Sequence, residues 1–77
     1  MKVKNKGVLN MQMSARNQLK GKITSIKKGP VSTEVEIDVN GTPVVSTITT
    51  GSADNLNLKT GDEVVAIIKA SNVMVGK

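Results

Sequence analysis

The 77-residue sequence contains no cysteine, no histidine and no aromatic residue. Without cysteine, the chain has neither disulfides nor thiolate ligands for a metal, and without histidine it also lacks the usual nitrogen ligands of zinc and haem. The common nucleophile–base pairs of enzymes also depend on cysteine or histidine. The composition therefore predicts a binding module rather than an enzyme, and we expect no side chains that act as direct cation ligands.

Long apolar runs are missing as well. No run approaches the roughly 20 residues that a membrane span needs, and the opening MKVKNKGVLNMQM is too polar for a secretory signal. We therefore expect a cytoplasmic protein without a membrane partner. A chain this short buries only about 60 % of its unfolded surface, so its single core is small. Since disulfides and metals are excluded, association with copies of itself is the support that remains.

The net charge of +5 is unevenly distributed along the chain. Eight of the eleven basic residues lie at or before Lys28, and all six acidic residues lie at or after Glu34. Such asymmetry is typical of proteins that bind nucleic acid. However, modules that hold single strands stack bases on aromatic side chains, and without them binding would rest on charge alone and be weak and salt-sensitive. We interpret the lysines as solvated charges and keep a charge-driven nucleic-acid-binding module as the alternative function.

The strongest secondary-structure signal is a hairpin. Residues 31–39 alternate apolar and polar side chains with the period of a half-buried strand. Asn40-Gly41 is a favoured pair for a two-residue type I′ turn, in which both residues need a positive φ. Residues 42–50, rich in valine, isoleucine and threonine, then form the return strand.

The rest of the chain predicts three further strands and one helical turn. The strands are expected at residues 19–26, 63–69 and 72–75, the second of them buried on both faces because residues 64–68 are continuously apolar. Ser52 is expected to cap the helical turn, a tight turn is expected at residues 59–62, and Met74 is expected to fill the core.

This pattern predicts an all-β fold, a small five-stranded barrel of the oligonucleotide/oligosaccharide-binding (OB) type with one short helical turn. An open β-sandwich and a swapped hairpin dimer are the alternatives that composition leaves open. We expect one domain over residues 13–77. Residues 1–12 form a lysine-rich leader, which is predicted to be either loose or an edge strand.

Three segments are rich in hydrogen-bond donors. The first, residues 13–21, offers the Ser14 hydroxyl and the Arg16 guanidinium; its plainer interpretation is a short helix capped by Ser14 and ended by Gly21. The second offers hydroxyls where a strand meets the helical turn, a place that favours anions, although threonine also suits strands and Ser52 also suits a cap. The third offers Lys69 and Ser71, although a lysine after a strand is often only the first solvated residue.

These segments share one chemistry, because each supplies donors and none supplies a base. Charge-assisted donors suit a compact dianion, which can only accept hydrogen bonds. A tetrahedral anion needs more donors than one short strand presents, so a site assembled across a subunit interface would suit both the anion and the small core. The sequence therefore predicts reversible binding of a compact anion.

Four strings carry a resemblance to a known family: SARNQLKG at residues 14–21, TEV at 33–35, ITT at 48–50 and IKASNVM at 68–74. Together they resemble the molbindin family, the molybdenum-pterin-binding (Mop) proteins and the related domains of molybdate-responsive regulators and transporter ATPases. The resemblance runs from about Met13 to Val75, and the leader departs from it. SARNQLKG is its most specific part.

The resemblance implies an OB-like fold, a homohexamer built as a trimer of dimers, and storage or buffering of molybdate or tungstate at subunit interfaces. It establishes no organic cofactor. A single domain, without an attached DNA-binding or ATPase domain, implies storage rather than regulation or transport. Carried over by motif, the oxyanion ligands are Ser14, Arg16, Asn17, Thr49, Ser52, Lys69, Ala70 and Ser71.

Overall fold

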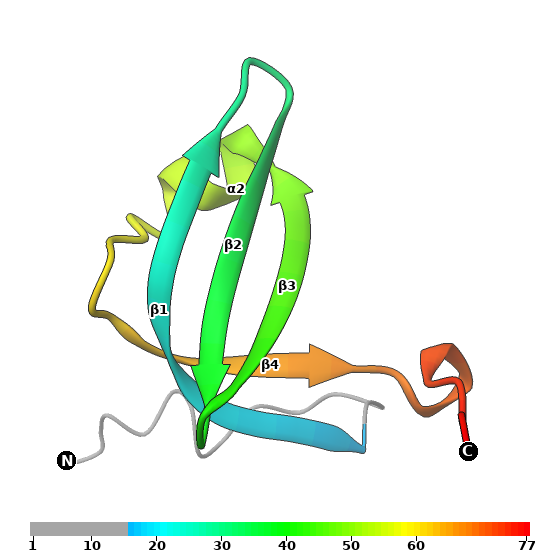
Figure 1. The fold of residues 1–77 in the computed structure, drawn as a ribbon. Coiled ribbons are helices and arrows are strands. Elements are labelled where there is room, and N and C mark those ends of the chain that lie inside the picture. Colours follow the sequence, from blue (N-terminus) through cyan, green and yellow to red (C-terminus); the bar gives the residue numbers. More distant parts are fainter. Residues whose placement is uncertain (1–15) are drawn as a thin grey trace, which may run out of the picture.

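The computed structural model describes residues 16–77, so the leader and Ser14 lie outside the described part. In that part, four antiparallel strands form one sheet in the order β3-β2-β1-β4 (Figure 1). The elements are β1 (Asn17–Lys28), β2 (Ser32–Val39), β3 (Thr42–Thr49), the short helix α2 (Thr50–Asn55), β4 (Glu63–Ile68) and the 3₁₀ turn η1 (Ala70–Asn72). The all-β prediction with one short helix is confirmed, but the described residues contain four strands rather than five. No helix among residues 16–77 has the length and hydropathy to cross a membrane.

The β2–β3 hairpin follows its sequence pattern closely. Thr33, Val35 and Ile37 are buried, while the acidic residues between them are more exposed. Asn40 and Gly41 have φ values of 51° and 89°, which is the pair of positive angles that a type I′ turn requires. The hairpin prediction is confirmed, with the strand beginning one residue later than expected.

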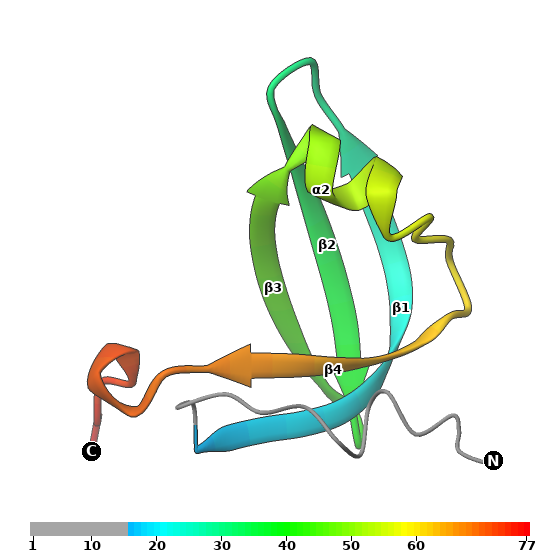
Figure 2. The same cartoon turned by 180° about the vertical axis from the view of Figure 1, so that it is seen from behind.

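Strand β1 is long and bent, and it pairs with two other strands, β4 and β2. Its first part pairs with β4 and its second part with β2, and Lys22 is the residue that pairs with both. A register shift between Ile23 and Ser25 marks an irregularity of the β-bulge kind, which bends a strand. The segment Asn17–Lys22 of β1 and strand β4 thus form a two-stranded ribbon. This ribbon runs across the base of β2, β3 and the second part of β1 (Figures 1 and 2). We call this pair of segments the ribbon arm.

The core is small and is built mainly from strands β1, β2 and β4. Ile23, Val35, Ile37 and Ala66 form its buried centre, and partly buried aliphatic side chains surround them. Helix α2 covers the end of the sheet where β1 ends and β2 begins (Figure 2). Its buried residue is Ala53.

Three expectations about the apolar residues near the C-terminus are wrong. Strand β4 buries only Ala66, and Ile67 is 37 % exposed, because only the face of β4 that carries Val64 and Ala66 packs against the core. Residues 72–75 form no strand: η1 occupies the beginning of this segment, and the residues after it run past the ribbon arm without a described strand beside them. Met74 and Val75 are 93 % and 94 % exposed, so Met74 does not fill the core of the single chain.

Gly21 lies inside β1 and does not end a helix. A Cβ atom there would lie 2.6 Å from both the Asp38 carbonyl oxygen and the Ile37 Cγ2 atom, which is too close for any real contact. We expect Gly21→Ala to lower the free energy of unfolding by about 1–3 kcal/mol, as overpacking usually does. Gly51→Ala is the matched control, because nothing lies within 4 Å of its added methyl group. Urea denaturation followed by circular dichroism measures both, and equal stability of the two variants would contradict the close approach.

Candidate functional site

The first and third donor-rich segments meet at the far end of the ribbon arm. Asn17 and Ile68 are register partners, and the Asn17 Nδ2 group donates a hydrogen bond of 3.1 Å to the Ile68 carbonyl oxygen. Arg16 immediately precedes β1 and Lys69 immediately follows β4, so continuing the antiparallel register sets these two residues opposite each other. Both are exposed, and the ion pair found within residues 16–77 joins Lys28 to Asp54, at the other end of β1.

The 3₁₀ turn η1 adds backbone donors beside Lys69. The Asn72 N–H donates to the Lys69 carbonyl at 2.8 Å and the Val73 N–H to the Ala70 carbonyl at 3.2 Å, while the Lys69 side chain makes no capping bond. The N–H groups of Ala70 and Ser71 come before the first bond of this turn and have no acceptor within the described residues. Arg16, Lys69, the exposed Ser71 hydroxyl and two N–H groups without an acceptor in residues 16–77 therefore belong to the same end of the ribbon arm.

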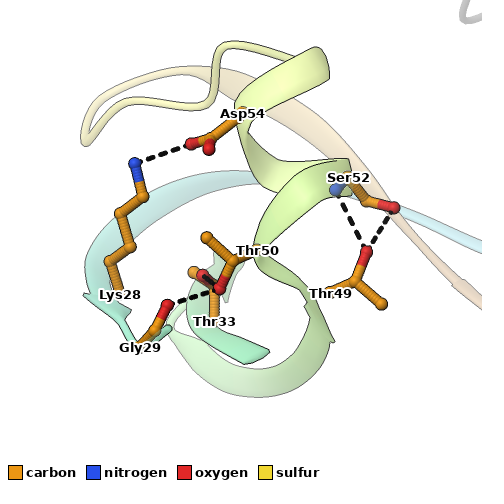
Figure 3. Close-up of polar contacts among 7 residues, drawn as sticks. All are labelled: Lys28, Gly29, Thr33, Thr49, Thr50, Ser52 and Asp54. Carbon is orange, nitrogen blue, oxygen red and sulfur yellow. Dashed lines mark hydrogen bonds and ion pairs between the residues drawn. The ribbon is translucent and has the colours of Figure 1, made fainter. Parts of the chain in front are cut away.

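The second segment forms the corner between β3 and α2. The Thr49 hydroxyl accepts a hydrogen bond of 3.0 Å from the Ser52 N–H and donates one of 2.7 Å to Ser52 Oγ (Figure 3). Thr49 is thus the N-cap of α2, and the prediction that Ser52 is the cap is wrong because the helix begins three residues earlier than that cap implies. The Ser52 hydroxyl hydrogen has no acceptor within residues 16–77, so Ser52 is the side-chain donor that the corner leaves available.

The corner lies far from the end of the ribbon arm. Thr49 pairs with Ser32, next to the end of β1, whereas Asn17 is the first residue of β1. Each of the two legs of β1 is about 17 Å long at the usual rise per residue, and the figures show them running in different directions. One tetrahedral anion cannot touch both places on the same chain. A single chain therefore brings together Arg16, Asn17, Lys69, Ala70 and Ser71, and leaves Thr49 and Ser52 apart from them.

A hollow of about 580 Å³ lies elsewhere, at the bend of β1, and is lined by Lys20, Gly21, Lys22, Asp38, Asn40, Glu63, Val64 and Val65. None of the predicted site residues lines it. Lys22 is the register partner of both Asp38 and Glu63, so the two lysines of the hollow are balanced by two carboxylates. This charge balance makes the hollow a poorer place for a dianion than the end of the ribbon arm. Residues 16–77 contain no group of three metal-ligating His, Cys, Asp or Glu side chains.

The comparison with protein families places the chain in a defined class. The model of the TOBE domain matches residues 13–75. A probable molybdenum-pterin-binding protein of Haemophilus influenzae is 52 % identical over 67 residues, which cover 86 % of this chain and 97 % of the relative. The chain therefore belongs to the TOBE domain family and, within it, to the molybdenum-pterin-binding proteins that its sequence resembles.

Solved structures agree with this assignment. A molybdate-binding protein from Sporomusa ovata is 39 % identical and superimposes with a TM-score of 0.84, covering 87 % of this chain and 100 % of that one. The cytoplasmic molybdate-binding protein ModG with molybdate bound is also 39 % identical, with a TM-score of 0.80, and the match covers 86 % of this chain and 48 % of ModG. The OB-like fold expected from the sequence is thereby confirmed.

Proposed function

We propose that this protein binds molybdate or tungstate reversibly, at interfaces between copies of itself, and thereby stores or buffers the oxyanion. The observation that carries the proposal is the pairing of Asn17 with Ile68, which sets Arg16 and Lys69 at the same end of the ribbon arm. The N–H groups of Ala70 and Ser71, which have no acceptor within residues 16–77, lie beside Lys69. The molybdate bound by the related ModG supports the choice of ligand.

The chemistry of this donor set suits a tetrahedral dianion. Guanidinium and ammonium groups neutralise its two charges, and N–H and hydroxyl donors fix its orientation, because every oxygen of the anion is an acceptor. The nearest carboxylate along β4 is Glu63, at the opposite end of that strand, so no like charge from β4 opposes the anion. Binding by hydrogen bonds and charge leaves the ligand chemically unchanged, which is what storage and release require.

The proposed interface is supported by two features of the single chain, namely the separation of its anion donors and its exposed apolar side chains. The corner donor Ser52 is too far from Arg16 and Lys69 to share an anion with them in one chain, but a second copy can present it. The ribbon arm has only two strands over most of its length, and an isolated two-stranded ribbon is marginally stable in water. Exposed apolar side chains lie on the arm and the segment after it: Leu19, Ile67, Val73, Met74 and Val75. We propose a homohexamer, a trimer of dimers, as the assembly, and the cytoplasm as its location.

Titration calorimetry with sodium molybdate and sodium tungstate tests the function, with sulfate as the control anion. We expect saturable binding of the first two, and molybdenum or tungsten in elemental analysis of protein purified from supplemented medium. Calorimetry is the suitable method because the chain has no tryptophan or tyrosine to report binding by fluorescence. Absence of any saturable signal at millimolar anion, together with tight binding of labelled RNA or DNA at moderate salt, would replace this function with charge-driven nucleic-acid binding.

A further inference from the structure

Two threonine hydroxyls, one buried and one half-buried, are linked to each other beside the corner between β3 and α2. Thr33, the second residue of β2, pairs with Ile48 next to the end of β3 and is completely buried. Its hydroxyl lies 2.8 Å from the Thr50 hydroxyl, which in turn donates to the Gly29 carbonyl at 2.6 Å (Figure 3). The Thr50 N–H also donates to the Val31 carbonyl at 2.9 Å. Both the side chain and the backbone of Thr50 are therefore fastened to the β1–β2 turn.

The direction of these bonds follows from counting hydrogens. A hydroxyl has one hydrogen to donate, and the Thr50 hydrogen is used on the Gly29 carbonyl, which can only accept. In the contact between the two threonines, Thr33 must then be the donor. The order of donation is Thr33 to Thr50 to Gly29, and loss of the Thr33 hydroxyl removes the bond that fixes Thr50 from below.

We infer that Thr33 and Thr50 are positioning residues, which hold the Thr49–Ser52 corner so that the Ser52 hydroxyl points in one fixed direction toward an oxyanion. Thr49 and Thr50 are adjacent, so a rotation of the Thr50 backbone would swing the Thr49 hydroxyl that receives the Ser52 N–H and donates to Ser52 Oγ. The inference rests on the proposed function, because it assumes that Ser52 is an oxyanion donor.

The placement of Thr33 argues for positioning rather than for stability alone. Its neighbours at the inward positions of β2, Val35 and Ile37, are aliphatic and complete the core without polar groups. Valine has the same shape as threonine and a high preference for strands, so it would fill this position without burying a hydroxyl. The buried hydroxyl instead occurs at the one inward position of β2 that reaches the corner, where a fixed geometry has a use.

The test compares variants that separate affinity from stability. Thr33→Val removes the hydroxyl and keeps the shape, Thr33→Ser keeps the hydroxyl, and Ile37→Val is the control, which removes one methylene group from the core away from the corner. We expect Thr33→Val to weaken molybdate binding about tenfold in calorimetry, corresponding to one hydrogen bond, and Thr33→Ser to restore most of it. Ile37→Val should lower the unfolding temperature and leave the dissociation constant within about twofold of the wild type.

Amide hydrogen exchange of the ligand-free protein supplies a second measurement. We expect the Ser52 N–H to exchange faster in Thr33→Val than in the wild type, and to be no faster in Ile37→Val once both are corrected for global stability. Unchanged affinity and unchanged Ser52 exchange in Thr33→Val would overturn the inference while leaving the proposed function intact. If the wild type bound neither molybdate nor tungstate, the proposed function would fail, and the exchange data would still decide whether Thr33 holds the corner.

Discussion

Replacing Lys69 with alanine is expected to weaken molybdate binding by about 10- to 100-fold, and replacing Arg16 with alanine by a similar factor. Hydrogen bonds to a charged group contribute about 1.5–3 kcal/mol each, which corresponds to this range. Both side chains lie at the end of the ribbon arm, where β1 begins and β4 ends. The loss should appear in the dissociation constant from calorimetry and leave the circular dichroism spectrum unchanged, because both residues are exposed.

Lys27→Ala is the matched control for these two variants. Lys27 is also an exposed cation on β1, but it pairs with Glu34 near the opposite end of the strand. Its removal changes the net charge by the same amount, and we expect it to change the dissociation constant by no more than about twofold, since exposed charges farther than a Debye length from the anion are screened. Equal and small losses in all three variants would remove the proposed site and leave only a general electrostatic attraction.

The hairpin and the turns could be predicted from the sequence because their signals are local. The alternation of residues 31–39 and the Asn40-Gly41 pair specify strand, turn and register within a few residues. The turn predicted at residues 59–62 is also present. Gly61 has a φ of 96°, and the Asp62 carboxylate accepts a hydrogen bond of 2.9 Å from the Lys59 N–H. Composition also supported a binding module, since the residues that most enzymes need are missing.

Features that depend on tertiary contacts, such as the burial of a strand, could not be predicted from local sequence patterns. A continuous apolar run such as residues 64–68 fits a strand buried on both faces, yet β4 has one partner and one covered face. Thr49, Thr50 and Ser52 are all good capping residues, so the sequence alone did not distinguish which of them begins α2. The Thr33–Thr50 contact requires the register of two strands and a turn, and no local pattern carries that information.

In the candidate site, too, the sequence predicted local features and did not predict those that depend on tertiary structure. The resemblance supplied its residues, and the pairing of Asn17 with Ile68 brings together two segments 51 residues apart. The distance between the corner and the ribbon arm is a property of the bent β1, and the periodicity of β1 gave no indication of the bend. Ser14 stays a prediction, because it lies outside the described residues.

The segment after η1 exposes three consecutive apolar side chains in the single chain. Val73, Met74 and Val75 follow one another, predict a strand and are exposed, with Met74 and Val75 making almost no contact with the rest of their own chain. Single exposed apolar residues are normal on a protein surface, whereas a contiguous apolar stretch beside an open-edged ribbon indicates an interface. We therefore expect this segment to pack against another copy.

The double substitution Met74→Lys/Val75→Lys is expected to dissociate the proposed homohexamer. Full burial of such side chains contributes about 1.5–3 kcal/mol each, so their loss from every copy should raise the dissociation constant of the assembly by at least about 100-fold. Light scattering after size-exclusion chromatography, detected by refractive index, measures the mass at several protein concentrations. The fold of each chain should persist, because these side chains contribute little to it.

Val31→Lys/Val45→Lys adds the same charge at two other exposed valines and is the control that should keep the wild-type mass. Because the proposed site needs Ser52 from one copy and Lys69 from another, the dissociated Met74→Lys/Val75→Lys protein should also lose molybdate binding. A monomeric variant that bound the anion with wild-type affinity would show that the ribbon arm suffices as a site and that the interface is not required. If the variant kept the mass of an oligomer, the C-terminal segment would not be part of the interface. The open edges of the ribbon arm would then be the next surfaces to test.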